Sequence, residues 1–466
     1  MVLLGLCCAV YMCGTELGCV IPLLTSILLS SAWALAGGWK FTEDRASVFA
    51  VLTVVTLLVS VLSVYRMTKV YAIPSSVHTT GKVITNREWG KRRAIIVDTQ
   101  YGKFAAYINS HGAPEEGAVI SLRGAVFDFK RARPTARGGF DEYLYWRSKG
   151  AVKKIAVLEM KIIGEPTGIY RWRNFLSERI KYTLPFNMSG YMLALTTGER
   201  DRQLAEIHRI TGTSHLLAVS GFHVGILAGL VSLLFRKGKK RVVCVTVLMW
   251  LYVMFAGFPA SGIRAALMVQ VYLLGLLLGR PSSAFNSVSV AGVILLLYDP
   301  WVFFDIGWQL SMLAALTMSA ISPLARPLPF KAAVASIAVW LVTAPVVASV
   351  FKTVTADGIL INIFAIPLFS ILFPLVVIFS IPALVGLPFG NLAADFMEYH
   401  LEAWEYFSEI AEKYFSVNVP FSYYLLAVSI VLFSALASYA SGIRGRRLLF
   451  TSAIFSLSAL LIITML

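Results

Sequence analysis

Long apolar segments recur along this 466-residue sequence and constrain its fold more than any other feature. Hydrophobic residues make up 58% of the chain and charged residues only 14%, so a water-soluble protein of this composition would expose large apolar patches. Many segments reach the roughly 20 residues that a helix needs to cross a bilayer. Because an open sheet would leave unpaired backbone groups in lipid, we expect helices. The pattern therefore predicts a polytopic α-helical membrane protein.

The apolar segments lie on either side of one polar region. Transmembrane helices are expected within residues 1–65, and a second set follows residue 182. The segment 359–388 contains Pro367, Pro374 and Pro382, which favours two short helices or a re-entrant pair. The expected apolar stretches of the second set are 213–235, 242–257, 262–279, 284–298, 306–321, 332–350, 359–388, 422–441 and 448–465.

Residues 389–420 carry a different pattern, in which glutamates and aromatic side chains recur every three or four positions. This spacing predicts an amphipathic helix with an acidic stripe at the membrane interface, ahead of C-terminal transmembrane helices in 421–466. A solvated stripe is the simpler interpretation. The alternative is that the stripe docks the basic polar region of the chain.

That polar region, residues 66–182, holds 22 Lys and Arg against 10 Asp and Glu, a net charge of +12. Apolar and polar residues alternate in five short stretches, and a helix-like segment at 140–150 precedes the last. Such a series suggests a small soluble β-barrel of the oligonucleotide-binding type, inserted into the membrane protein. The five predicted strands are 77–88, 92–100, 103–109, 118–129 and 153–163.

Cations and aromatic residues interleave along the predicted barrel. Cations that follow phosphates, together with aromatic platforms for bases, suit single-stranded nucleic acid. A basic face beside anionic lipid is the alternative. The aromatic residues are Trp89, Tyr101, Phe104, Tyr107, Phe127 and Phe129. The candidate DNA-binding cations are Lys91, Arg92, Arg93, Lys103, Arg123, Lys130, Arg131, Arg133 and Arg137.

The segment 211–225 places His215, Ser220 and His223 at the start of an apolar stretch. Polar side chains are costly in hydrocarbon, so they mark a pathway or site unless they only hydrogen-bond neighbouring helices. Gly221 opens a row of three glycines at four-residue spacing, which would form a thin packing face on a continuous helix. It could instead break the helix and direct the backbone N–H groups of the next half-helix at an anion.

Basic loops predict the orientation in the membrane. RKGKKR at 236–241 and IRGRR at 443–447 should be cytoplasmic. Counting membrane crossings outward from the loop 236–241 places the barrel on the outer side. Both basic loops are cytoplasmic only if the segment 359–388 returns to the outer face instead of crossing the membrane. By the same count, the polar residues of several predicted helices lie toward the outer side of the membrane. This distribution favours a polar vestibule that opens outward. Its candidate lining residues are His215, Ser220, Gly221, His223, Arg264, Asp305, Gln309 and Asn362.

Three ordered motifs together resemble one family. LTTGERDRQL followed by HRITGTSHLLAVSGFHVG, then GFPASGIRAALM, then YDPWVFFDIGWQLS are similar to the competence domain of the ComEC family of bacterial DNA-uptake channels. RARPTARGGFDEYLYWRSKGA resembles the end of that family's N-terminal oligonucleotide-binding-like domain. The resemblance covers about 81–362 and makes 183–388 a competence-type channel domain. It implies transport of one DNA strand across the inner membrane while the other is degraded outside.

The family's motif residues carry over one at a time. Its histidine and its Ser-Gly-x-His signature fall on His215, Ser220, Gly221 and His223. Its Gly-x-x-x-Ser-x-x-Arg element falls on Gly257, Ser261 and Arg264, with a loop altered by Gly262, and its aspartate and Gln-Leu-Ser fall on Asp305 and Gln309. We interpret all of them as structural or channel-lining residues, and none as catalytic.

One departure from the family is large. Many members continue into a C-terminal metallo-β-lactamase-like domain, whereas this sequence ends at Leu466 without a His-x-His-x-Asp-His motif. We therefore expect a short form that is not an enzyme and has no metal or cofactor, with a separate nuclease as partner. A Gly-rich nucleotide loop is also missing, so the resemblance implies a cytoplasmic helicase motor and an outer-side DNA receptor.

Two other functions use the same residues. An ion-coupled small-molecule transporter would also place His, Asp and Arg between broken helices, although it does not explain the basic barrel. An intramembrane hydrolase could use Ser220 as nucleophile, His223 as base and Asp305 as the group that orients the base. On one helix Ser220 and His223 would lie about 60° apart, whereas His215 and Ser220 would lie about 140° apart, which fits poorly.

Overall fold

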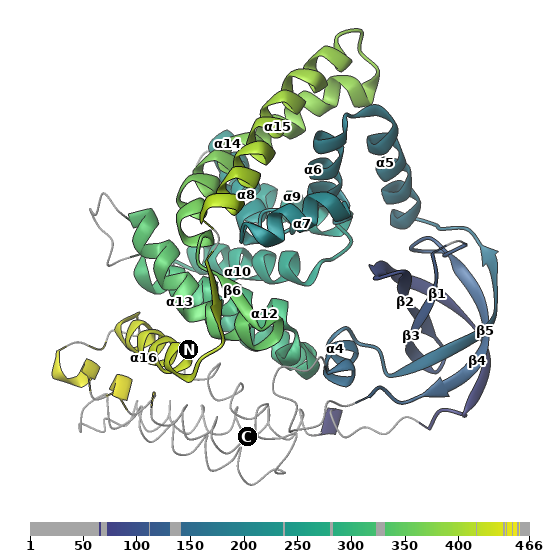
Figure 1. Cartoon of the computed structure of the whole chain (residues 1–466), viewed down its shortest axis with the longest axis horizontal. Helices are drawn as coiled ribbons and strands as arrows, with labels where there is room; N and C mark the ends of the chain where they lie inside the picture. The colour runs from purple at the N-terminus through teal and green to yellow at the C-terminus, as the bar shows by residue number, and fades with distance from the viewer. Residues whose placement is uncertain are drawn as a thin grey trace.

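The computed structural model describes residues 65–66, 72–110, 112–130, 141–235, 238–279, 283–322, 331–415, 417–440, 443, 445–449, 451–453 and 456. They form a β-barrel followed by a helical domain (Figure 1). The helices expected within 1–64 lie outside the described residues, as do Arg131, Arg133 and Arg137. Most of the last expected apolar stretch, 448–465, also lies outside them.

The barrel is closed by five strands in the order β1-β2-β3-β5-β4, with β4 returning to pair with β1. All neighbours are antiparallel except β3 and β5, which run parallel. The strands are β1 (Ser76–Trp89), β2 (Arg92–Thr99), β3 (Gly102–Asn109), β4 (Val119–Phe127) and β5 (Lys153–Gly164). Each overlaps a predicted strand to within a few residues at its ends, so the small five-stranded barrel is confirmed.

Two apolar clusters hold the barrel together. Alternate residues such as Ile95, Val97 and Phe104 fill its interior and are fully buried. The opposite face of β2 and β3 is also covered, because Trp146 of helix α4 (Glu142–Ser148) packs there with Ile96 and its neighbours. The helix-like segment predicted at 140–150 contains α4, and Asp141 caps it, since its side chain accepts a hydrogen bond from the Leu144 backbone N–H at 2.9 Å.

The helical domain begins with three helices, α5 (Ile169–Thr183), α6 (Phe186–Thr196) and α7 (Arg202–Ile210). Further helices follow, most of them apolar, and the strands β6 (Thr353–Thr355) and β7 (Asn418–Pro420) among them pair in a two-stranded sheet. The helices are α8 (Gly221–Leu234), α9 (Lys239–Phe255), α10 (Ala260–Leu277), α11 (Ala284–Tyr298), the 3-10 helix η1 (Pro300–Phe304), α12 (Ile306–Ile321), α13 (Lys331–Phe351), α14 (Gly358–Val385), α15 (Gly390–Phe415) and α16 (Tyr423–Ala440).

Four of the described helices are long and apolar enough to cross a bilayer, namely α10, α13, α14 and α16. Helices α8, α11 and α12 are apolar but shorter. A polytopic α-helical membrane protein that carries a small β-barrel is therefore confirmed.

The broken segment expected at 359–388 is instead one continuous helix, α14. Pro367, Pro374 and Pro382 all lie within it. Apolar helices tolerate proline where neighbouring helices, serine and threonine side chains and local adjustments compensate the freed backbone groups. The re-entrant prediction is therefore wrong. The basic loops 236–241 and 443–447 were expected on the same side of the membrane only if the segment 359–388 returned to the outer face, and a continuous helix does not provide that return.

Helix α15 runs alongside α14 and also packs against α6 and α7 (Figure 1). Leu401 and Trp404 of α15 are buried against Phe369 of α14 in the largest apolar cluster of the domain. The Glu398 carboxylate accepts hydrogen bonds from the backbone N–H groups of Asn187 and Met188 at 2.8 and 2.7 Å, which caps α6. Part of the predicted acidic stripe is therefore used to hold the helical domain together.

Candidate functional site

The segment between α7 and α8, residues 211–220, is not helical. The continuous helix predicted over 213–235 is wrong in its first part, because α8 begins only at Gly221. His215 is exposed on this irregular segment, while Leu216 and Leu217 beside it are buried. In a membrane domain, non-helical backbone occurs only where protein buries it or water reaches it. Protein buries most of this segment, and its exposed side chains are Ser214 and His215.

Ser220 and His223 form the cap that starts α8. The Ser220 hydroxyl accepts a hydrogen bond from the Phe222 backbone N–H at 3.3 Å, and His223 Nδ1 accepts one from the Ser220 backbone N–H at 3.2 Å. This reciprocal pair is a capping box with histidine in the place usually held by a glutamate. The alternative in which Gly221 starts a new helix is thus the one that the structure adopts.

The glycine row of α8 does not pack closely against another described helix. A Cβ added at Gly225 or Gly229 would meet no atom within 4 Å, and one at Gly221 would only touch the Ala265 side chain at 3.7 Å. The predicted thin packing face is therefore wrong for the part of the chain that the structure describes. Both Gly225 and Gly229 are exposed there.

A buried chain of hydrogen bonds fixes the start of the irregular segment. His208 of α7 bonds through Nδ1 to the Thr213 hydroxyl and through Nε2 to the Tyr191 hydroxyl, each at 2.7 Å. The Tyr191 hydroxyl also donates to the Glu405 carboxylate of α15. Sequence reasoning missed these residues, although His208 stands only seven positions before His215 in the motif that carries the resemblance.

Asp305 and Gln309 secure the turn between η1 and α12. Asp305 caps α12 by accepting a hydrogen bond from the Trp308 backbone N–H at 3.2 Å, and the Gln309 side chain donates to the Phe303 carbonyl at 2.9 Å. Arg264 of α10 donates to the Gly307 carbonyl at 2.9 Å and is attracted by the Asp305 charge. Three of the predicted lining residues, Arg264, Asp305 and Gln309, therefore meet at the start of α12.

Buried polar atoms at the candidate site keep unused hydrogen-bonding capacity. Arg264 is only 3% exposed, and its Nε and Nη1 groups have no partner among the described residues. The same holds for His223 Nε2 and for the side-chain oxygen of Asn362, in the first turns of α14. Buried groups without partners are rare and costly, so a polar path through these helices would explain them.

The barrel is fastened directly to the Asp305 turn. Lys149, just after α4, forms an ion pair with the Asp305 carboxylate. The Arg147 guanidinium lies 4.4 Å from the centre of the Trp301 ring in η1, and the Tyr143 ring meets Trp301 edge-on at 5.6 Å. Sequence reasoning did not foresee this contact between the two domains.

A second contact joins the β3–β4 turn to α5. Arg173 bridges the domains, because Nη1 binds Glu116 at 3.0 Å and Nη2 donates to the Thr197 carbonyl at 2.8 Å. Asn174 donates to Glu115 at 2.5 Å. Two separate anchors therefore hold the barrel in one orientation beside the helical domain (Figure 1).

The predicted DNA-binding cations are dispersed over the barrel. Lys91 and Arg92 are exposed at one end of β2, and Arg93 is held by Asn86 at 2.7 Å. Lys103 lies opposite Asp98 in the ladder of β2 and β3. Asp98 is six residues after Arg92, so Lys103 is about 20 Å from Arg92 along the strand direction. Arg123 is exposed and lies 3.8 Å from Glu159, while Lys130 is exposed after β4.

Most of the predicted aromatic platforms are not free to stack on bases. Phe104 and Phe129 are buried, and the half-buried Trp89 and Tyr107 contact one another and Trp146. Phe127 is exposed. Since α4 covers the outer face of β2 and β3, nucleic acid would have to contact the exposed cations at the rim of the barrel.

Two ionisable side chains at the contact of α4 with the barrel, Tyr107 and Glu142, have shifted pKa values. Burial raises the pKa of the Tyr107 hydroxyl to about 12, an effect reinforced by the nearby Glu142 carboxylate. For Glu142, burial opposes ionisation, but the hydrogen bond from Lys154 at 2.9 Å and the Lys130 backbone N–H hold its pKa below the ordinary value. Glu142 is therefore a charged anchor that ties α4 to β3 and β5.

Fold and site together define a multi-pass membrane protein whose barrel is fixed beside a polar turn of the membrane domain. The family model for the competence protein matches residues 195–442, which is more than half of the chain and includes the irregular segment, α8, α10 and α12. This chain therefore belongs to the competence protein family. No solved structure matches the chain at a significant level.

Three curated relatives match parts of the chain. ComE operon protein 3 of Bacillus subtilis is 32% identical over 251 residues, which are 49% of this chain and 32% of that protein. An uncharacterized protein of Aquifex aeolicus is 27% identical over 55% of this chain and 63% of its own length. Recombination protein 2 of Haemophilus influenzae is 31% identical over 96 residues, 20% of this chain and 12% of its own. The chain thus spans about a third of the Bacillus subtilis protein and less than two thirds of each of the three.

Proposed function

We propose that this protein forms a membrane route for single-stranded DNA into the bacterial cytoplasm. Membership of the competence protein family implies a role in DNA uptake. The observation that supports a channel most strongly is the irregular segment 211–220, which carries an exposed histidine inside an apolar helical domain. Non-helical backbone at membrane depth occurs where protein buries it or where it lines a water-filled cavity, and we assign the exposed His215 side of the segment to a hydrated DNA path.

In this proposal the vestibule is lined by two groups of polar residues. One is the segment with His215 and the Ser220–His223 cap, and the other is the turn where Arg264 meets Asp305. The unpartnered N–H groups of Arg264 suit phosphate oxygens, which accept hydrogen bonds from guanidinium groups. None of these residues acts as a catalyst in this account.

The barrel delivers the strand in this account. Its exposed Lys91 and Arg92 attract phosphates, and its anchoring through Lys149 keeps it next to the Asp305 turn. The basic loop at 236–241 favours a barrel on the outer side of the cytoplasmic membrane. An outer-side DNA receptor, a separate nuclease and a cytoplasmic helicase motor are the partners that this role requires.

Two alternatives are weaker. For a hydrolase, Ser220 Oγ lies 3.3 Å from His223 Nδ1, but that nitrogen also accepts the Ser220 backbone N–H and His223 Nε2 meets no described carboxylate. The base therefore lacks the orienting group that nucleophilic catalysis uses. An ion-coupled transporter does not explain why a basic barrel is anchored to the membrane domain.

Deleting the gene in its host and following labelled DNA tests the proposal. We expect DNA to accumulate outside the cytoplasmic membrane without entering the cytoplasm, and entry to return when the intact gene is restored. Unimpaired entry of labelled strands in the deletion strain would refute the channel.

A further inference from the structure

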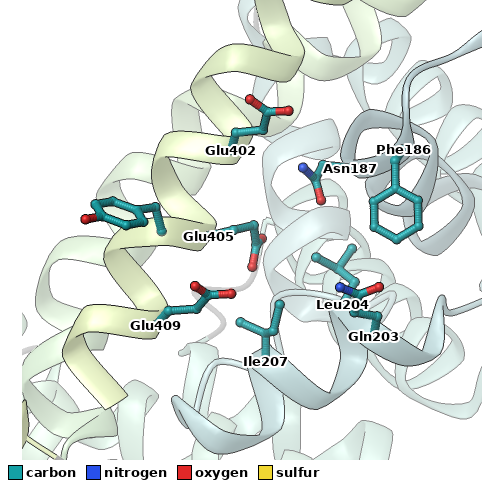
Figure 2. Close-up of a pocket in the computed structure, with 9 residues that line it drawn as sticks. Phe186, Asn187, Gln203, Leu204, Ile207, Glu402, Glu405 and Glu409 are labelled. Atoms are coloured by element: carbon teal, nitrogen blue, oxygen red, sulfur yellow. The ribbon is translucent and has the colours of Figure 1, made fainter. Parts of the chain in front are cut away.

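An acidic cavity of about 270 Å³ lies between α15 and α7, and its lining includes Glu405, the carboxylate that accepts the Tyr191 hydrogen bond. Figure 2 shows Glu402, Glu405 and Glu409 of α15 on the side that faces α7. They are spaced by three and four residues, so their carboxylates follow one face of the helix over about 10 Å. Leu204 and Ile207 of α7 supply an apolar wall opposite them.

The buried member of this row is incompletely satisfied. Glu405 is only 7% exposed. Its Oε1 atom accepts the Tyr191 hydrogen bond and lies 3.5 Å from His208 Nε2, but its Oε2 atom has no partner among the described residues. A buried carboxylate oxygen without a donor is expensive, because the charge loses its hydration without replacement. The cavity therefore lacks a donor at its innermost end.

The negative charge at the cavity mouth is also uncompensated. Neither Glu402 nor Glu409 forms an ion pair or a hydrogen bond with a described residue, and both are exposed. By contrast, other carboxylates nearby are used: Asp201 caps α7, and Glu206 pairs with Arg209 at 2.6 Å. Like charges three and four residues apart on a helix repel, so a cation here would stabilise α15.

The chemistry of the cavity favours an organic cation over a metal ion. No group of three His, Cys, Asp or Glu side chains in the described residues is arranged to hold a metal. Carboxylates spread along a helix face opposite an apolar wall instead match a charged nitrogen on a carbon stem. Phe186 at the start of α6 extends the apolar wall of the cavity.

We propose that this cavity binds an alkylammonium or guanidinium group. The charged nitrogen donates to Glu405 Oε2 and is neutralised by Glu402 and Glu409, while the carbon stem packs on Leu204 and Ile207. The cation is either a free polyamine or a lysine or arginine side chain of a partner protein. This site goes beyond the proposed DNA route and does not depend on it.

The test uses the full chain in nanodiscs of zwitterionic phosphatidylcholine, with calorimetric titration at 0.15 M salt to suppress unspecific attraction. Spermidine represents the free polyamine, and a helical peptide with lysines three and seven positions after the first represents the partner side chain. Octane-1,8-diol, of similar length but uncharged, is the control ligand. We expect one-to-one binding of spermidine or of the peptide and none of the diol, and the ligand that binds identifies the source.

Variants decide whether the binding is at this cavity. Glu405→Gln should weaken it about tenfold or more, because a charge-assisted hydrogen bond is lost. The exposed pair Glu402→Gln and Glu409→Gln, which does not disturb the core, should weaken it as well, whereas Asp395→Asn on the exposed face of α15 should not. Absence of binding by both cations, or equal binding by wild type and both carboxylate variants, would overturn the proposal.

Discussion

The ion pair between Lys149 and Asp305 should be energetically coupled, and this coupling should hold the barrel on the membrane domain. The pair is largely buried, with side-chain exposures of 26% for Lys149 and 7% for Asp305. Breaking a fully buried pair costs about 3–5 kcal/mol. Here Lys149 is partly solvated and Asp305 keeps its hydrogen bond from Trp308, so we expect about 2 kcal/mol, or roughly 30-fold in the opening equilibrium.

A double-mutant cycle isolates this energy. Lys149→Met keeps the apolar stem, and Asp305→Asn keeps the ability to cap α12 but also removes the charge that attracts Arg264. Hydrogen exchange of the backbone amides in α4 and η1 reports the opening of the contact. Each single variant should accelerate exchange, and the double variant should be no faster than Asp305→Asn alone. If the two effects simply add, the ion pair does not hold the barrel in place.

Further variants test the cap, the barrel, its pH dependence and its charge. Ser220→Ala should destabilise α8 by about 1 kcal/mol and Ser220→Gly by only a few tenths, seen as faster amide exchange at the start of the helix; equal effects would contradict the capping role. Gly124→Ala should destabilise the barrel in thermal unfolding by about 1–3 kcal/mol, since its Cβ would lie 2.2 Å from the Ala156 carbonyl oxygen; an unchanged midpoint would contradict that packing. Because folding lowers the pKa of Glu142, this carboxylate stabilises the barrel above pH 4.5, and the stabilisation is lost as the pH falls through the lowered pKa. Glu142→Gln should therefore reduce the loss of barrel stability at acid pH. An unchanged dependence of stability on pH would show that Glu142 does not cause that loss. Arg92→Ala should weaken single-strand binding by the full chain and reduce the slope of log affinity against log salt by about 0.7; an unchanged slope would mean that Arg92 contacts no phosphate.

The barrel was predictable because burying one face of a strand imposes a period of two on the sequence. Ile95, Val97 and Phe104 follow that period and point inward. The same period could not show that α4 covers the other face of β2 and β3, since this depends on where Trp146 packs. The interleaved aromatic residues therefore resembled a stacking surface in sequence but are mostly packed in the structure.

The membrane domain was predictable in its helices but less so in their ends. An apolar stretch looks the same whether it is a helix or a buried irregular segment, which is why 213–220 was assigned to the helix that begins at Gly221. The three prolines of α14 predicted a break that the structure does not have, because packing against neighbouring elements compensates the backbone groups that proline leaves unbonded. Sequence reasoning missed Lys149 and His208 and placed Glu405 only in the acidic stripe, because all three meet partners that only the fold brings to them.

In the proposed channel a DNA strand passes the irregular segment 211–220, and photocrosslinking during uptake probes that passage. A benzophenone amino acid is placed at position 215, or at the control position 233 on the exposed end of α8, and cells are irradiated while they take up labelled DNA. We expect protein–DNA crosslinks at position 215 and none at position 233. Continued DNA uptake without any crosslink at position 215 would contradict this expectation.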